Sequence, residues 1–184
     1  KAIATDYCAK SECPNFKAFL GDIFEDDLDL IGYVQRAIGY SLTGSTSDQC
    51  LFILIGDRAN GKSTFINVIN ELSGDYSKAA LSQTLVAKGS SSIGDDLVDL
   101  VSARLISVTE TEAGEALAEA KIKQMSGGYV LEGRLLYGSW LEFSTIGKIF
   151  LATNSLPQIN NTDHGIWRRI QAIPFNRTFR AEEQ

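Results

Sequence analysis

The sequence predicts an α/β fold with a central, mostly parallel sheet and helices on both of its faces. The first observation behind this prediction is the run GDRANGKS at residues 56–63, which fits the phosphate-loop pattern G-x-x-x-x-G-K-[ST]. The second is its setting, because residues 50–55 form an apolar run typical of a buried strand and residues 62–72 have helical periodicity. The third is the alternation of strand and helix patterns in the rest of the chain, which favours parallel strands joined by helices.

The loop between that strand and that helix predicts a binding site for a nucleoside triphosphate. Its glycines let backbone N–H groups point inward at phosphate oxygens, and the positive end of the helix dipole adds to this attraction. We expect Lys62 to reach the β- and γ-phosphates and the Ser63 hydroxyl to ligate Mg²⁺. The residues expected to hold the nucleotide are Gly56, Ala59, Asn60, Gly61, Lys62, Ser63 and Thr64.

Composition limits the function classes. The chain has 184 residues, of which 44% are hydrophobic and 22% charged, which is ordinary for a globular domain with one core. No segment resembles a signal peptide and no apolar run approaches the roughly 18 residues that span a bilayer, so no membrane partner is expected. The formal net charge of −6 argues against a broad face for duplex DNA, although a ring could concentrate a few cations in its channel. The chain starts at Lys1 rather than at a methionine, which favours an excised fragment.

Three cysteines, Cys8, Cys13 and Cys50, are an odd number without the spacing of a zinc site. Cys50 is expected in the buried strand at residues 50–55. We interpret all three as reduced thiols, which favours a cytoplasmic location.

The N-terminal part of the chain has a helical pattern over residues 14–44. The polar run TGSTSD at residues 43–48 is typical of a loop and is the best candidate for a boundary. We therefore divide the chain into a small helical region at residues 1–46, expected to help oligomerisation, and an ATPase domain at residues 47–184.

A second strand is predicted at residues 104–110, and it ends in Glu110, with Glu112 two residues later. Ligands bind at the carboxyl ends of the strands in a parallel sheet, so Glu110 is expected beside the phosphate loop. There a carboxylate can hold Mg²⁺ through water or deprotonate the attacking water, with Glu112 assisting. Glu112 could instead cap a helix beginning near Glu115. The candidate metal ligands are Ser63, Glu110 and Glu112.

A third strand, at residues 148–153, is followed by Asn154, whose amide could contact the γ-phosphate or position the lytic water, although Asn is also a common turn residue. Further on, Arg168 and Arg169 precede a short strand at residues 170–175. They could form a salt-bridged structural pair or supply an arginine finger across a subunit interface. His164, the only histidine, is interpreted as a loop residue rather than a general base.

The order of these motifs resembles that of the superfamily 3 helicases, and more narrowly the C-terminal ATPase region of phage and plasmid primase-helicases. The resemblance rests on the phosphate loop, on ETE at residues 110–112 and GG at 127–128, and on L-x-Y-G at 135–138, LATN at 151–154 and IWRR at 166–169. It extends to N-F-x-x-F-L at residues 15–20 and Y-x-Q-R-x-x-G-Y-x-L-T-G at 33–44, and so covers nearly the whole chain. The chain departs from the family pattern at Tyr129 and His164, where relatives often carry an acid.

The resemblance implies an AAA+-like P-loop NTPase core and a role for each motif. Lys62 and Ser63 take the Walker A roles and Glu110 the Walker B role. Asn154 becomes the sensor, and Arg168 or Arg169 the finger.

The family's DNA-contacting hairpin is expected within residues 129–143, between a helix ending near Met125 and the sensor strand. The nearby cations Lys121, Lys123 and Arg134 could meet phosphates, and Trp140 could stack on a base. The alternative is that the lysines are solvated and Trp140 packs in the core.

The function that the resemblance implies is that of an ATP-dependent DNA helicase. It would hydrolyse ATP with Mg²⁺ between the subunits of a ring, usually a hexamer, and move a DNA strand, expected to be single-stranded, through the central pore. A primase module on the same full-length chain is also implied. Two alternatives stay open: a small-molecule kinase built on the same phosphate loop, and an assembly module in which ATP only holds subunits together. The first lacks an evident acceptor site, and the complete set of Walker residues disfavours the second.

Overall fold

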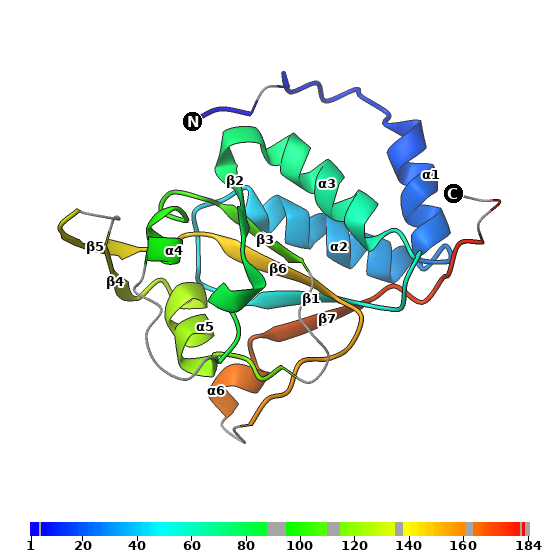
Figure 1. Cartoon of the computed structure of the whole chain (residues 1–184). Helices are drawn as coiled ribbons and strands as arrows, with labels where there is room; N and C mark the ends of the chain where they lie inside the picture. Colours follow the sequence, from blue (N-terminus) through cyan, green and yellow to red (C-terminus); the bar gives the residue numbers. More distant parts are fainter. Residues whose placement is uncertain are drawn as a thin grey trace.

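The chain folds around a five-stranded sheet in the order β2-β3-β6-β1-β7 (Figure 1). The structure is a computed structural model and describes residues 1–3, 5–87, 95–109, 115–134, 138–160, 164–180 and 182. The strands are β1 (Leu51–Ile55), β2 (Ser77–Ala80), β3 (Leu105–Thr109), β6 (Lys148–Thr153) and β7 (Ile170–Pro174).

Every pair of neighbouring strands in this sheet is parallel, and β1 lies between β6 and β7. The strand β1 consists of apolar residues only, and β6 is buried along its whole length. Such runs are typical of parallel strands with both faces covered. The α/β fold class predicted from the sequence is therefore confirmed.

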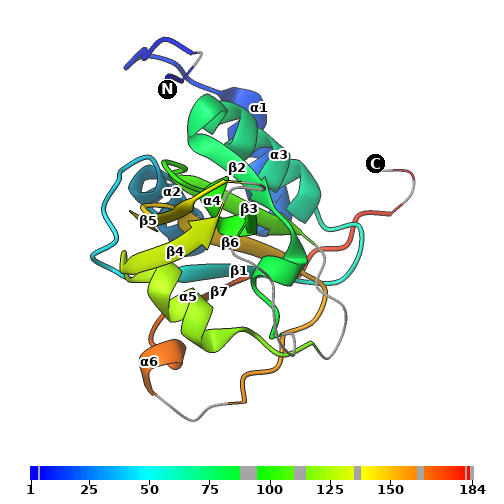
Figure 2. The same cartoon turned by 60° about the vertical axis from the view of Figure 1, so that its left-hand side comes forward.

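Three helices cover one face of the sheet (Figures 1 and 2). They are α1 (Pro14–Ile23), α2 (Leu28–Ser41) and α3 (Lys62–Ser73). Their buried side chains share one hydrophobic cluster with alternate residues of the strands, among them Phe52, Phe150 and Ile173. The helices α1 and α2 thus pack onto the same sheet as α3. The division of the chain at residue 46 stays a prediction.

The opposite face carries α5 (Glu119–Ser126) and α6 (His164–Trp167), together with the short helix α4 (Asp95–Val98). Here the cluster includes Leu51, Ile53 and Ile149, the strand residues that alternate with those of the first face. Two single-turn 3₁₀ helices, η1 (Gly74–Tyr76) and η2 (Ser82–Thr84), flank β2. His164 begins α6 and is exposed, rather than lying in a loop.

A buried lysine closes the end of the sheet where the strands begin. The Nζ atom of Lys148 donates to the backbone oxygens of Thr43 (2.5 Å), Ser45 (3.1 Å) and Ile146 (3.1 Å). It also lies 4.8 Å from the centre of the Tyr40 ring. Burial lowers the pKa of Lys148 to about 8. This side chain therefore holds the loop between α2 and β1 against the amino end of β6.

A separate antiparallel hairpin is formed by β4 (Val130–Arg134) and β5 (Trp140–Ser144). The hairpin expected within residues 129–143 is present, and Trp140 lies in β5, opposite Arg134. Its side chain is 63% exposed, which rules out the alternative of a core tryptophan. The exposed apolar side chains of the hairpin and its approach are Tyr129, Val130, Trp140 and Leu141.

Cys50 is buried immediately before β1, while Cys8 and Cys13 are exposed, and all three are free thiols. Burial raises the pKa of Cys50 to about 11. Within the described ranges, no helix combines the length and apolar character needed to cross a membrane.

Candidate functional site

The phosphate loop lies where β1 ends and α3 begins, as predicted. Gly61 precedes α3 with φ +85°, and Ala59 has φ +56°. These left-handed conformations turn the chain sharply from the strand into the helix. Gly61 also lies close to α1, because a Cβ atom there would be 2.7 Å from Cγ2 of Ile23 and 3.3 Å from Cε2 of Phe19. Only glycine fits this position without a shift of α1.

The side chain of Lys62 is folded into the loop and is 7% exposed. Its Nζ donates to the backbone oxygens of Gly56 (2.5 Å) and Asp57 (2.8 Å) and to Oδ1 of Asn60 (2.9 Å). Burial lowers the pKa of Lys62, and the nearby Asp57 carboxylate partly counters this effect. The ammonium group is thus held by oxygens of the loop itself, at the place where phosphate oxygens could replace them.

The segment after β7 crosses the loop and fixes its shape. The backbone N–H of Phe175 donates to O of Ile55, and that of Phe179 donates to O of Ala59, both at 2.7 Å. The amide of Asn60, which is 3% exposed, donates to O of Phe175 at 3.2 Å. We call residues 175–179 the crossing segment.

The first turn of α3 is suited to an anion. Ser63 and Thr64 are exposed there, and the twelve residues of α3 include no acid in the first turn. Gly61 provides no side-chain cap, and the N–H of Lys62 makes a long hydrogen bond of 3.5 Å to Oδ1 of Asn60, so the N–H groups of this turn can serve a ligand. The predicted phosphate-binding residues thus lie in one loop and helix turn, where Ser63 and Thr64 are exposed and Asn60 and Lys62 are buried.

Two neighbouring strands end beside this loop. Ile55 of β1 is in register with Thr153 of β6, and Ala152 of β6 with Thr109 of β3. The exposed Asn154 follows β6 directly and so lies at the same edge as the phosphate loop. Glu110 and Glu112, the predicted carboxylates, lie outside the described residues. The next helix, α5, begins at Glu119 and not near Glu115, and no side-chain cap bond precedes it.

The two arginines lie at the other end of the sheet. Leu51 N–H donates to O of Arg169 at 2.7 Å, which places Arg168 and Arg169 beside the start of β1. Arg169 is 4% exposed, and its guanidinium donates to Oγ of Ser126 at 3.1 Å and to O of Gly165. Arg168 is exposed. The structure therefore separates a buried, internally bonded arginine from one that faces outward.

Gln49 is a site residue that sequence reasoning missed. Its Oε1 accepts hydrogen bonds from the guanidinium groups of both Arg168 and Arg169, the latter at 2.8 Å. Gln49 has φ +49°, and its N–H donates to O of Thr46 at 3.1 Å. A glutamine in a loop before a strand does not indicate a functional role by itself. No pattern in the neighbouring sequence connects Gln49 to arginines about 120 positions away.

The predicted DNA-contacting residues lie on two elements, α5 and the hairpin. Lys121 and Lys123 are half-buried on α5, whereas Trp140 projects from the hairpin. The backbone of Arg134 pairs with that of Trp140, and its side chain lies outside the described part.

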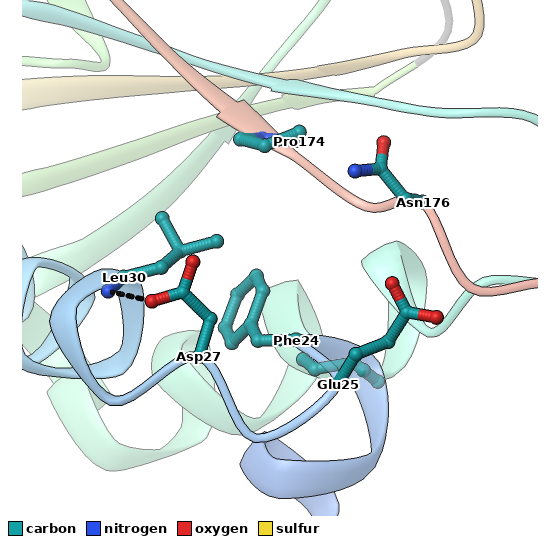
Figure 3. Close-up of a pocket in the computed structure, with 7 residues that line it drawn as sticks. Phe24, Glu25, Asp27, Leu30, Pro174 and Asn176 are labelled. Carbon is teal, nitrogen blue, oxygen red and sulfur yellow. Dashed lines mark hydrogen bonds between the residues drawn. The ribbon is translucent and has the colours of Figure 1, made fainter.

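A cavity of about 290 Å³ opens between the N-terminal helices and the end of β7 (Figure 3). One wall is the turn between α1 and α2 together with the start of α2, and the other is the end of β7 and the residue after Phe175. Its lining residues are Ile23, Phe24, Glu25, Asp27, Leu30, Pro174 and Asn176.

Three viral proteins, each named "Putative helicase", are similar to the chain over 88% of its length. They are L207/L206 of Acanthamoeba polyphaga mimivirus (31% identical over 163 residues), 022R of Frog virus 3 isolate Goorha (24% over 168) and 184R of Invertebrate iridescent virus 6 (26% over 170). The chain spans 17% of the length of each of them. No protein-family model matches the chain.

Among solved structures, the NrS-1 C-terminal region is similar to the chain, with a TM-score of 0.66 at 15% identity for one apo form and 0.64 for another. The match covers 95% of this chain and 40% of the first of these structures. At this identity the likeness concerns the fold. The sequence likeness relates the chain to one segment of the viral proteins named as helicases.

Proposed function

We propose that the chain is the ATP-hydrolysing motor domain of a DNA helicase of the superfamily 3 type. In this proposal ATP and Mg²⁺ bind between neighbouring subunits of a ring, expected to be a hexamer, and hydrolysis moves a DNA strand, expected to be single-stranded, through the central pore. The viral relatives that are named as helicases support the helicase part of the proposal. A primase module on the same full-length protein is part of the proposal too.

The observation that carries the proposal is the separation of Lys62 from Arg168. The phosphate loop follows Ile55, whereas Arg168 lies beside Leu51 at the opposite end of β1. Four residue steps of about 3.3 Å each put roughly 13 Å of strand between the two positions, which exceeds the reach of an arginine side chain. An exposed arginine at this end cannot serve the loop of its own subunit and can serve that of a neighbour.

The chemistry follows from the residues at each end. A bound triphosphate would be held by Lys62 and by N–H groups in the first turn of α3, and the Ser63 hydroxyl would ligate Mg²⁺. Glu110 would deprotonate the attacking water, and Glu112 would assist at the metal. Asn154 orients that water beside the γ-phosphate. The neighbour's arginine neutralises charge that develops on the phosphoryl oxygens.

The choice between the two arginines favours Arg168. The guanidinium of Arg169 is buried and bonded to Ser126, Gly165 and Gln49 of its own subunit. Arg168 is exposed and bonded to Gln49, so it can reach a neighbouring molecule. For DNA, the proposed contact is the hairpin, where the exposed indole of Trp140 can stack on an unpaired base and Arg134 can meet phosphate, with Lys121 and Lys123 adding positive charge nearby.

The test measures ATP hydrolysis against protein concentration, with and without single-stranded DNA. A site shared between subunits makes the specific activity rise with concentration until the ring is filled, and DNA raises it further. The Trp140→Ala variant should lose most of the DNA stimulation and keep the basal rate, while Trp167→Ala, an exposed tryptophan outside the hairpin, serves as its control.

Specific activity that is independent of both concentration and DNA contradicts the motor. In that case a phosphoryl acceptor other than water indicates the kinase alternative. ATP-dependent assembly without any turnover indicates the assembly module.

A further inference from the structure

One arginine of the phosphate loop has no part in the motif that predicts the loop. Arg58 occupies the third position of G-x-x-x-x-G-K-[ST], where the pattern accepts any residue. Its side chain is exposed, and its guanidinium makes no hydrogen bond, ion pair or ring contact with the described part of the chain. By contrast, Arg104, Arg169 and Arg177 each donate to oxygens of their own subunit. Arg58 can therefore bind a ligand without breaking a contact of the folded chain.

The position of Arg58 follows from the contacts of Lys62. The Nζ atom of Lys62 lies 2.8 Å from the backbone oxygen of Asp57. That oxygen belongs to the peptide group that joins Asp57 to Arg58, so it lies about 3 Å from the Cα atom of Arg58. This Cα atom is thus within about 6 Å of the Lys62 ammonium, and an extended arginine side chain is about as long. A phosphate that Lys62 contacts is within reach of Arg58 in the same subunit.

The backbone on either side of Arg58 is held by the crossing segment. Ala59, the next residue, has φ +56° and accepts a hydrogen bond at 2.7 Å from the N–H of Phe179. Before Arg58, the oxygen of Ile55 accepts from the N–H of Phe175, also at 2.7 Å. The base of the arginine side chain is therefore fixed beside the expected phosphates, so that only side-chain freedom is lost when the guanidinium binds.

The charges in the loop give this arginine a role. Burial lowers the pKa of Lys62, and the Asp57 carboxylate acts against this effect, so a negative charge lies close to the expected phosphates. A carboxylate there repels a triphosphate, and the guanidinium of the adjacent Arg58 offsets this repulsion. A guanidinium also binds phosphate oxygens through two parallel N–H groups, which adds geometric specificity to the attraction.

From this arrangement we infer that Arg58 binds the β- and γ-phosphates of the nucleotide held by its own subunit, beside Lys62. The inference rests on the proposed function in so far as it takes a nucleoside triphosphate to lie on the phosphate loop. It differs from the proposed role of Arg168, which serves the loop of a neighbouring subunit. Each site then has one arginine from its own chain and one supplied by a neighbour.

The test measures the dissociation constants of ATP and ADP for Arg58→Gln, which keeps a polar side chain and removes the charge. Arg36→Gln makes the same change at an exposed position of α2 and serves as the control. Arg58→Gln should weaken ATP binding about tenfold and ADP binding about threefold or less, because ADP lacks the γ-phosphate. Arg58→Lys should recover part of the loss, and Arg36→Gln should change neither constant.

The variant Asp57→Asn separates a direct contact with phosphate from neutralisation of the neighbouring carboxylate. If Arg58 binds phosphate, adding Arg58→Gln to Asp57→Asn still weakens ATP binding about fivefold or more. If the arginine only offsets Asp57, the double variant binds ATP as tightly as Asp57→Asn alone, and the inference is overturned.

A mixing experiment identifies the subunit on which Arg58 acts. Arg58→Gln and Lys62→Ala damage the same loop, so a mixture of the two variants should hydrolyse ATP no faster than the separate preparations. Lys62→Ala mixed with Arg168→Ala, where turnover should reappear, serves as the control for the formation of mixed rings. Recovery in the mixture with Arg58→Gln means that Arg58 acts on a neighbour, which overturns the inference.

The outcomes separate this inference from the proposed function. If Lys62→Ala weakens ATP binding and Arg58→Gln does not, the phosphate site stands and the inference is overturned. If Lys62→Ala leaves ATP binding unchanged, the proposed nucleotide site itself is wrong.

Discussion

The two ends of the central sheet differ in the backbone N–H groups and charged side chains that they present. At the carboxyl end, the loop between β1 and α3 presents a helix start without a side-chain cap on Gly61, and Lys62, whose ammonium donates to three loop oxygens. At the amino end, cations are either buried like Lys148 and Arg169 or exposed like Arg168. The first end carries the predicted triphosphate site, with the exposed Arg58 in the loop itself, and the second carries Arg168. If Arg168 is the finger, as proposed, it serves the loop of a neighbouring subunit, and the catalytic centre is made from two subunits.

The most direct test of a site shared between the two ends of neighbouring subunits is an experiment that mixes two variants, and here we expect the largest effect. Lys62→Ala and Arg168→Ala should each lower ATP turnover by about a hundredfold or more, because one removes the phosphate contact and the other the finger. In a mixture, the intact loop of an Arg168→Ala subunit meets the intact arginine of a Lys62→Ala subunit, so turnover should reappear. A steady-state phosphate-release assay measures it, and absence of recovery in mixed rings contradicts the shared site.

The carboxyl end alone is tested by Gly56→Ala. A Cβ atom at Gly56 would lie 2.2 Å from O of Phe175 and 2.5 Å from Nδ2 of Asn60, so the crossing segment must move away from the loop. We expect loss of nucleotide binding and a decrease of about 3 kcal/mol in the free energy of unfolding. The matched control is Gly39→Ala in α2, where nothing lies within 4 Å of the added methyl group and the change should be neutral or stabilising by about 0.5 kcal/mol. Urea unfolding and nucleotide titration check both.

At the amino end, we expect Gln49 to act as a positioning residue for the finger. Gln49→Ala removes the acceptor shared by Arg168 and Arg169, and turnover should fall roughly tenfold with an unchanged nucleotide dissociation constant. Gln35→Ala on the exposed face of α2 is the control.

A merely structural role for Gln49 would not produce asymmetric rescue in mixtures. The intact phosphate loop of a Gln49→Ala subunit should be activated by Lys62→Ala subunits, which supply a well-placed arginine. Arg168→Ala subunits supply none and should not activate it. Equal rescue by both partners argues against positioning.

The smallest expected effect is a pH dependence at the amino end. Because the pKa of Lys148 is about 8 in the folded protein and 10.5 in the unfolded chain, the unfolded state binds more protons between these values. The free energy of unfolding should therefore rise with pH above 8, by about 1 kcal/mol between pH 7 and pH 9. Lys148→Met should lose this rise, and Lys78→Met, at an exposed position, should keep it. If the free energy of unfolding changes with pH in the same way in the wild type and in Lys148→Met, the buried ammonium of Lys148 is not the cause of the pH dependence.

Local patterns were enough to predict much of the fold. The strands β1, β3, β6 and β7 have apolar runs, and α3 has clear helical periodicity, so their positions were predicted to within one or two residues. The strand β2, with the sequence SKAA, was not predicted, because a short strand with exposed small and charged residues lacks an apolar run.

The phosphate loop was predicted because its function depends on neighbours in sequence. The contacts of Gln49, the crossing segment and the cavity join residues more than a hundred positions apart, and no periodicity in one sequence encodes such pairs. The roles of Glu110 and Glu112 stay predictions, since both lie outside the described residues. The resemblance assigned the finger to Arg168 with Arg169 as the alternative, and the two differ in burial and in their hydrogen bonds.

The crossing segment has a mechanical consequence. Residues 175–179 are tied to the phosphate loop by the Ile55–Phe175 and Ala59–Phe179 backbone bonds and by the amide of Asn60, and to α1 by the ion pair of Arg177 with Asp22. Asn60 takes part on both sides, because its Oδ1 accepts from Lys62 while its Nδ2 donates to O of Phe175. A movement of the phosphate loop is therefore passed through direct bonds to the crossing segment, and through the Arg177–Asp22 ion pair to α1.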